Sequence, residues 1–168
     1  MNAPRITRIL VPVDFSVSSG TALSYARMLA TMMGASLHLL HVADEISATV
    51  AYTPAAEAIV DIDPDDAVAE DLGGQLCNLL SADDVRRFHA TSALVFGPAA
   101  AAITRYATAH DIDLIVMGTG CQTCLADTAL AERVGRTSDC PVLMVRESGA
   151  VKLWSLDRSH HHFAAGAS

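Results

Sequence analysis

A short polar loop that follows an apolar run has the residue types best suited to ligand chemistry in this chain. The run at 114–117 leads into Gly118, Thr119 and Gly120, and a helical pattern begins at Leu125. In open α/β folds, ligands bind where strand ends and helix N-termini direct backbone N–H groups into one crevice. The loop therefore predicts a turn that could hold an anion such as a phosphate.

The same loop carries a second reactive pattern, Cys121-Gln122-Thr123-Cys124. A helix N-terminus lowers the pKa of a thiol, so a redox or metal-binding role makes physical sense. A structural zinc site takes four ligands, and no second pair is evident, although Cys140, the histidines at 160–162 or a second subunit could contribute. The alternative is that the two cysteines are small residues that fill the loop.

The composition predicts a packed globular domain and argues against several kinds of partner. The chain has 168 residues, of which 51% are hydrophobic and 18% charged, which excludes a disordered chain. The net charge is −8, Lys152 is the only lysine, and no basic stripe is present, so nucleic acid and anionic membranes are not expected partners. A Walker-type phosphate loop needs a lysine after glycine, and the sequence has none there.

The same sequence predicts a cytoplasmic protein. No apolar stretch is long enough to span a bilayer, and no long apolar region follows the two arginines near the start, as a signal peptide would require. In a reducing compartment, the cysteines at 77, 121, 124 and 140 are expected to be free thiols.

Apolar runs alternate with helical patterns along the chain. Strands are predicted at 6–13, 35–42, 88–96, 114–117 and 142–145, and helices at about 16–33, 63–80, 99–110 and 125–137. Residues 44–63 have no clear period and indicate a long loop. The alternation predicts an α/β fold with a five-stranded, doubly wound parallel sheet, right-handed crossovers and helices on both faces.

Several motifs, in this order and spacing, resemble the universal stress protein family. They lie at 9–16, 40–42, 97–98, 113–119, 131–134 and 140–145. The resemblance covers roughly 5–146, which makes 1–146 the domain and 147–168 a C-terminal tail. It implies a Rossmann-like fold, a dimer joined through the last strand and a role in stress survival. It implies no catalytic chemistry, so we expect a binding or signalling module and, at most, weak nucleotide hydrolysis.

The resemblance also implies ATP or AMP as the candidate ligand. Asp14 would hydrogen-bond adenine or ribose, and Val13 and Val42 would contact the base. The candidate binding residues are Pro12, Val13, Asp14, Val42, Met117, Gly118, Thr119, Gly120, Thr128 and Ala129. A structural alternative for Asp14 is that it caps the first helix together with Ser16 and Ser18.

The phosphate loop departs from the family pattern, which is Gly, two residues, Gly, nine residues, Gly, then Ser or Thr. Gly118 matches the first glycine, but Cys121 occupies the second position and Gly120 comes one place early. With 131–134 as the anchor, the final pair falls on Thr128 and Ala129, so the loop is about three residues short.

These departures predict that the site holds a triphosphate weakly or not at all. A Cβ at Cys121 or Thr128 obstructs the approach of backbone to phosphate, and Asp127 places a carboxylate near the helix N-terminus. Adenine or ribose contacts through Asp14 could survive. The alternative is that the hydroxyls of Thr119, Thr123 and Thr128 replace the missing donors, and the protein senses adenine nucleotides.

The strand at Val142 to Val145 ends at Arg146 and has the pattern of an edge strand. An exposed apolar edge promotes association, so pairing with a second copy would protect it and would give the homodimer. The alternative is that the tail covers this edge through Leu153 and Trp154. His38 and His41 are three residues apart on one strand and should face opposite sides of the sheet, so His41 is expected to make a core or loop hydrogen bond.

Overall fold

The computed structural model describes residues 5–43, 67–120, 125–146 and 150–154, and within these ranges the sheet has six strands. The strands are β1 Arg8–Pro12, β2 Ser36–Ala43, β3 Thr91–Phe96, β4 Leu114–Thr119, β5 Val142–Arg146 and β6 Val151–Trp154. Their order is β3-β2-β1-β4-β5-β6, with the first five parallel and β6 antiparallel to β5. The predicted doubly wound α/β fold is confirmed, with one strand more than expected.

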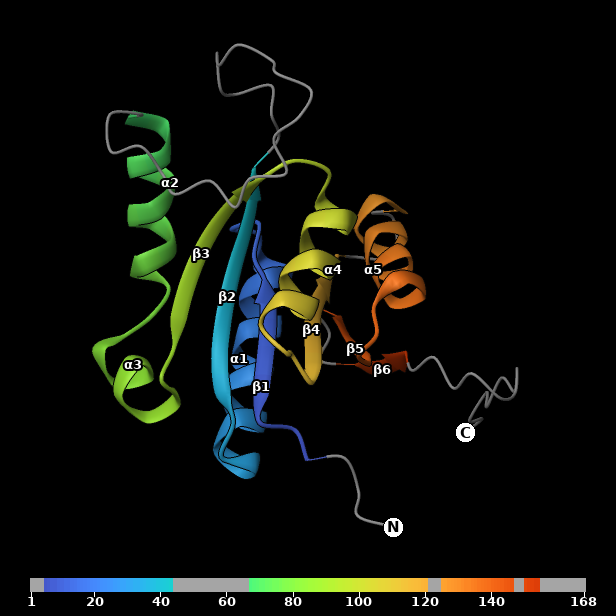
Figure 1. Cartoon of the computed structure of the whole chain (residues 1–168), viewed down its shortest axis with the longest axis horizontal. Coiled ribbons are helices and arrows are strands. Elements are labelled where there is room, and N and C mark those ends of the chain that lie inside the picture. Colours follow the sequence, from blue (N-terminus) through green and yellow to red (C-terminus); the bar gives the residue numbers. More distant parts are fainter. Residues whose placement is uncertain (1–4, 44–66, 121–124, 147–149, 155–168) are drawn as a thin grey trace.

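Helices cover both faces of this sheet, as predicted (Figure 1). They are α1 Val17–Met33, α2 Ala67–Asn78, α3 Ala82–Phe88, α4 Ala99–Ala109 and α5 Leu125–Thr137. Helix α1 packs on one face with contributions from α2 and α3, while α4 and α5 cover the other. None of the described helices is both long and apolar enough to cross a membrane.

Alternation along β1 divides the core between the two faces. Ile9 and Val11 face α1, whereas Leu10 faces α4 and α5, and all three side chains are fully buried. Successive side chains of a strand point to opposite faces, so a strand covered on both sides must be apolar throughout.

Helix α1 begins and ends where the sequence predicts. The hydroxyl of Ser16, its N-cap, accepts a hydrogen bond from the amide of Ser19 at 3.2 Å. Gly34 ends the helix in the left-handed conformation, at φ 66°, and its N–H donates to the carbonyl of Ala30. Glycine suits this position because it has no Cβ to oppose a positive φ.

The prediction that the third strand begins at Phe88 is wrong, because Phe88 ends helix α3 and β3 begins at Thr91. Helix α3 starts with a capping box in which Ser81 and Asp84 each bond the other's backbone amide. His89 then turns the chain with a φ of 46°. A capping box satisfies two free amides at once, so it stabilises a helix this short.

The prediction that β5 is an edge strand is also wrong. β6 pairs with β5 in antiparallel register, from Val142 opposite Trp154 to Val145 opposite Val151. The tail therefore supplies a strand that satisfies the open backbone groups of β5, as the alternative proposed. The loop predicted at 44–63 lies outside the described residues.

Candidate functional site

The sheet has a topological switch point between β1 and β4. From β1 the chain continues to β2 and β3 on one side, and β4 and β5 lie on the other side. The helices that follow β1 and β4 consequently pass to opposite faces and open a crevice at the carboxyl ends of these strands. The predicted residues at 12–14 and 117–120 lie at these two strand ends.

A cavity of about 210 Å³ occupies this crevice. It is lined by Pro12, Val13, Asp14, Ser19, Leu40, Val42, Ala99, Ile103, Met117, Gly118 and Leu130. Six of the ten predicted binding residues are therefore brought together: Pro12, Val13, Asp14, Val42, Met117 and Gly118. Pockets for drug-sized ligands are typically about 300–1,000 Å³, so the cavity encloses part of such a ligand and leaves the rest at its mouth.

Asp14 lines the cavity and also contacts Ser16, the N-cap of α1, while its predicted contact with ribose or adenine stays a prediction. Its Oδ1 accepts hydrogen bonds from the amide of Ser16 at 3.0 Å and from the hydroxyl of Ser16, which orders the start of α1. Partial burial raises the pKa of Asp14, but the hydrogen bonds from Ser16 and Ser19 outweigh it, so the pKa lies below its ordinary value. The side chain is an ionised acceptor, and a carboxylate has enough lone pairs to bind a ligand hydroxyl as well.

The turn between β1 and α1 is fixed by contacts with β2. The Nδ1 of His41 lies 2.7 Å from the carbonyl oxygen of Val13 and donates to it, which confirms the loop hydrogen bond expected for this histidine. Phe15 has a φ of 62° and packs its ring on that of His41, with 4.6 Å between centroids. A bulky residue with positive φ is strained, and such strain is concentrated at functional sites. Nothing in the sequence indicates the positive φ of Phe15.

Gly118 does not have the positive φ predicted for this loop, but packing requires a glycine there. In the described residues the glycines with positive φ are Gly34 and Gly97, so Gly118 does not supply a left-handed turn. A Cβ added to Gly118 would collide with the carbonyl of Ser18 and lie 2.7 Å from the amide nitrogen of Ser19. The glycine lets the first turn of α1 pack directly on the end of β4, which shapes the cavity wall.

The other predicted residues do not line the cavity. Thr119 is buried, and its hydroxyl donates to the carbonyl of Val145 at 3.4 Å, so it lies between β4 and β5. Gly120 is half-buried beyond the strand end, and Thr128 and Ala129 are exposed on α5. One of the three hydroxyls suggested as replacement phosphate donors is thus already engaged elsewhere.

Cys121, Thr123 and Cys124 lie outside the described residues, as does the side chain of Asp127, so the thiol redox or metal role stays a prediction. Among the residues that the structure describes, no group of three or more His, Cys, Asp or Glu side chains is placed to hold a metal ion. Of the two described cysteines, both free, Cys77 is exposed and Cys140 is half-buried.

Five cavity residues were not predicted: Ser19, Leu40, Ala99, Ile103 and Leu130. The start of α4 had a sequence signal in Gly97-Pro98, because proline commonly precedes or begins a helix. Pro98 is the N-cap of α4 and makes no side-chain cap hydrogen bond. Leu40, Ile103 and Leu130 have the pattern of ordinary core residues, and periodicity does not separate core from cavity wall.

The fold and the crevice define a class of protein, the doubly wound α/β domains, in which ligands commonly bind at the switch point of the parallel sheet. Residues 5–146 match the universal stress protein family, and the chain belongs to this family. The predicted membership is confirmed over the same range. The comparison with curated proteins gave no match.

Several solved structures with the same fold are universal stress proteins. One from Burkholderia pseudomallei is 29% identical, with 86% of this chain and 98% of that chain covered and a TM-score of 0.58. One from Lactobacillus plantarum is 27% identical, covers 86% of this chain and 100% of that chain, and has a TM-score of 0.57.

Two more distant relatives were solved with adenine nucleotides. A universal stress protein in complex with cAMP is 18% identical over 86% of this chain and 99% of that chain, with a TM-score of 0.60. A universal stress protein from Archaeoglobus fulgidus, in complex with dAMP, is 17% identical over 84% of this chain and 98% of that chain, with a TM-score of 0.55. At these identities the likeness shows a shared fold alone.

Proposed function

We propose that this domain is a stress-response binding module that holds the adenosine part of an adenine nucleotide in the crevice between β1 and β4. The cavity that places the apolar side chains of Val13, Val42 and Met117 beside the carboxylate of Asp14 carries this proposal. An apolar slot accommodates a base, and an ionised acceptor at its mouth binds ribose hydroxyls. The relatives solved with cAMP and dAMP support the ligand class.

The phosphate groups contribute little to affinity in this proposal. None of the described residues that line the cavity is Lys or Arg, and Asp14 adds a negative charge. One favourable feature is the start of α4, where Ala99 reaches the cavity and Pro98 provides no side-chain cap. Amides in the first turn of a helix favour one anionic group. A monophosphate should therefore bind at least as tightly as a triphosphate.

Isothermal titration calorimetry with adenosine, AMP and ATP tests the proposal on the wild type, Asp14→Asn and Asp14→Ala. Asparagine keeps an oxygen for the Ser16 amide but loses the charge, so AMP affinity should fall roughly tenfold while stability stays close to wild type. Alanine should also lose both hydrogen bonds from Ser16, the N-cap of α1, and cost about 1 kcal/mol of stability. Equal AMP affinity in all three proteins, or the absence of binding heat in the wild type, would overturn the proposal.

The module is proposed to act through binding, with nucleotide hydrolysis weak at most, and in the cytoplasm. The described cysteines Cys77 and Cys140 are free thiols, which suits a reducing compartment. A signalling role requires that bound nucleotide change the affinity of the domain for some other molecule. This happens only if the nucleotide binds one conformation of the domain more tightly than another.

A homodimer through the β5–β6 edge is part of the proposal. β6 is now the edge strand, and its Val151 and Leu153 are exposed large hydrophobic residues, 46% and 61% accessible. An exposed apolar edge strand is a surface that a second sheet edge can cover. Light scattering coupled to size-exclusion chromatography tests this, and a monomer at all concentrations would contradict it.

A further inference from the structure

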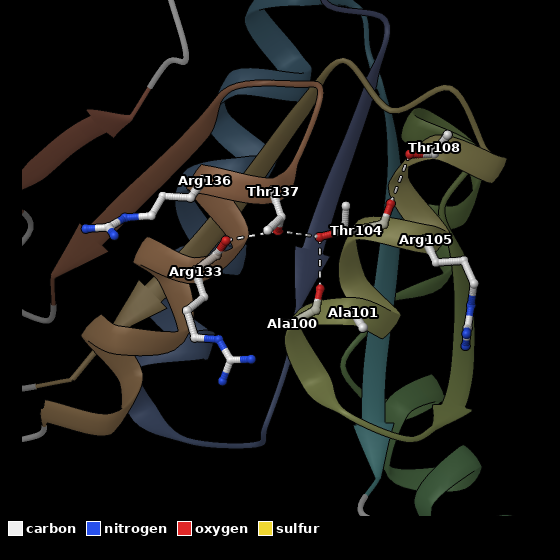
Figure 2. Close-up of a pocket in the computed structure, with 8 residues that line it drawn as sticks. All are labelled: Ala100, Ala101, Thr104, Arg105, Thr108, Arg133, Arg136 and Thr137. Atoms are coloured by element: carbon white, nitrogen blue, oxygen red, sulfur yellow. Dashed lines mark hydrogen bonds between the residues drawn. The ribbon is translucent and has the colours of Figure 1, made fainter. Parts of the chain in front are cut away.

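A second cavity, of about 500 Å³, lies outside the nucleotide crevice in a groove between α4 and α5 (Figure 2). Ala101, Thr104 and Arg105 of α4 line it, together with Arg133, Arg136 and Thr137 of α5. Its volume falls in the range of about 300–1,000 Å³ that is usual for binding pockets. The nucleotide proposal uses none of these residues.

The floor of the groove offers few hydrogen-bond donors. The hydroxyl of Thr104 donates to the carbonyl of Ala100 at 2.9 Å, and that of Thr137 donates to the carbonyl of Arg133, also at 2.9 Å. The two hydroxyl oxygens also lie 3.2 Å apart, so either one can donate to the other instead of to its carbonyl and join α4 to α5 across the floor (Figure 2). Each hydroxyl has one proton, and both protons are engaged by the protein itself. The floor therefore presents methyl groups and hydroxyl acceptors.

The rim of the groove is cationic. Arg105, Arg133 and Arg136 are all exposed, and none of them takes part in a salt bridge among the residues that the structure describes. The salt bridges found there pair Arg8, Arg27, Arg86 and Arg87 with aspartates. In a chain with a net charge of −8, three arginines around one groove are a local reversal of charge.

The arginine side chains also limit what the groove can bind. Figure 2 shows that Arg136 and Arg105 extend in different directions from their helices and do not converge with Arg133 on one point. A small anion on the floor would find no free hydroxyl proton and no ring of guanidinium groups. A longer ligand can place apolar atoms on the floor and carboxylates at each arginine.

We propose that this groove docks an acidic amphipathic helical segment of a partner protein. Its apolar face would lie on Ala101 and the threonine methyls, and its carboxylates would reach Arg105, Arg133 and Arg136. Helix-in-groove recognition has this form, and complementary charge sets the choice of partner. α5 has 13 residues, so it extends about 20 Å, which a helical segment of about 13 residues would match.

Fluorescence anisotropy tests the proposal on the full chain with a labelled peptide of about 15 residues, roughly four helical turns. The peptide carries glutamates on one helical face and leucine and alanine on the other, and its control has glutamine for each glutamate. The Arg133→Gln/Arg136→Gln variant removes two rim charges, and Arg86→Gln/Arg87→Gln removes two arginine charges from α3, outside the groove. Ala101→Trp fills the floor and leaves the charges in place.

The acidic peptide should bind roughly tenfold more tightly than its glutamine control, and Arg133→Gln/Arg136→Gln should lose roughly tenfold in affinity. Ala101→Trp should weaken binding by a similar factor, while Arg86→Gln/Arg87→Gln should stay near wild type. If both arginine variants lost peptide affinity equally, the net charge of the protein would explain the binding, and the proposal would be overturned. If pyrophosphate displaces the labelled peptide as readily as unlabelled peptide does, the groove binds small anions and the proposal is wrong. The absence of any peptide binding would also overturn the proposal.

Discussion

Gly118, at the end of β4, lies directly against the backbone of Ser18 in the first turn of α1. A Cβ on Gly118 would meet the Ser18 carbonyl, with the Ser19 amide nitrogen 2.7 Å away. This contact brings the end of β4 and the start of α1 together at the crevice between β1 and β4, where Gly118 and Ser19 both line the cavity. A residue that seemed to serve phosphate is therefore also required for packing.

Gly118→Ala should destabilise the fold by about 2 kcal/mol, because atoms added to a tight contact force the backbone apart. It should also weaken AMP binding, since α1 must shift. Urea denaturation and calorimetry measure the two effects. Gly20→Ala is the control: no atom lies within 4 Å of the added Cβ, so alanine should stabilise α1 by about 0.5–1 kcal/mol. Similar effects in both variants would contradict the packing role.

The ion pair between Arg27 of α1 and Asp84 of α3 is expected to hold these helices together. The guanidinium Nη2 lies 2.8 Å from Oδ2 of Asp84 and also donates to the carbonyl of Leu79 at 2.7 Å. Asp84→Ala should cost about 3 kcal/mol, since it leaves Arg27 unpaired and breaks the capping box. Asp83→Asn, which removes only exposed ion pairs, should cost less than about 1 kcal/mol in the same urea titration.

The same pair gives stability a defined dependence on pH. Burial raises the pKa of Asp84, but hydrogen bonds from Arg27 and Ser81 outweigh it and hold the pKa below its ordinary value of 3.8. Because the unfolded chain binds the proton more readily, the contribution is fully present above 3.8 and is lost as the pH falls through the lower folded pKa. Asp84→Asn should therefore flatten the acid limb of the stability curve, and an unchanged limb would count against the pair.

His38 should make the free energy of unfolding depend on pH near neutrality as well. Burial lowers its pKa, and the positive charges of His110 and Arg8 lower it further. The unfolded chain then takes up a proton near the ordinary pKa of 6.5 while the fold keeps His38 neutral, so stability falls as the pH drops below 6.5. His38→Gln should reduce this slope in urea titrations at about pH 7.5 and 5.5. A slope identical to that of the wild type would contradict the assignment.

Strand β6 should be needed for the integrity of the β5 edge. Deletion of residues 147–168 removes β6 and exposes the backbone groups of β5, so stability should fall and non-specific aggregation should replace the proposed dimer. Deletion of 155–168 alone keeps β6 and serves as the control. Light scattering and thermal denaturation measure both properties. Equal behaviour of the two truncated proteins would show that β6 contributes nothing to the edge.

The sequence predicts the parallel part of this fold well because each strand there is a continuous apolar run, such as Leu114 to Met117. β6 gave no such signal: Val151-Lys152-Leu153-Trp154 is short and mixed, and it becomes a strand only by pairing with β5. Helix α3 has seven residues, too few for a clear period, although Ser81 and Asp84 form a recognisable capping box.

The site was predictable where residues follow strands, as Asp14 follows β1 and Gly118 ends β4. It was not predictable where core and cavity share one pattern, as at Leu40 and Ile103. Thr119 shows the opposite error, because a hydroxyl next to a glycine suggests a phosphate donor, yet its side chain bonds the neighbouring strand. Local spacing gives the position of a residue along the chain, but the direction of its side chain depends on packing.

Calorimetric titration of AMP into Val42→Phe tests whether the crevice between β1 and β4 holds a nucleoside. Val42 lies in the cavity wall, and the larger ring would fill space that the base needs, without a change in charge. Val17→Phe is the matched control, because Val17 is 75% exposed and lies outside the cavity. We expect micromolar AMP binding in the wild type and in Val17→Phe, and at least roughly tenfold weaker binding in Val42→Phe. Equal AMP affinity in Val42→Phe and Val17→Phe would contradict a nucleoside site between β1 and β4.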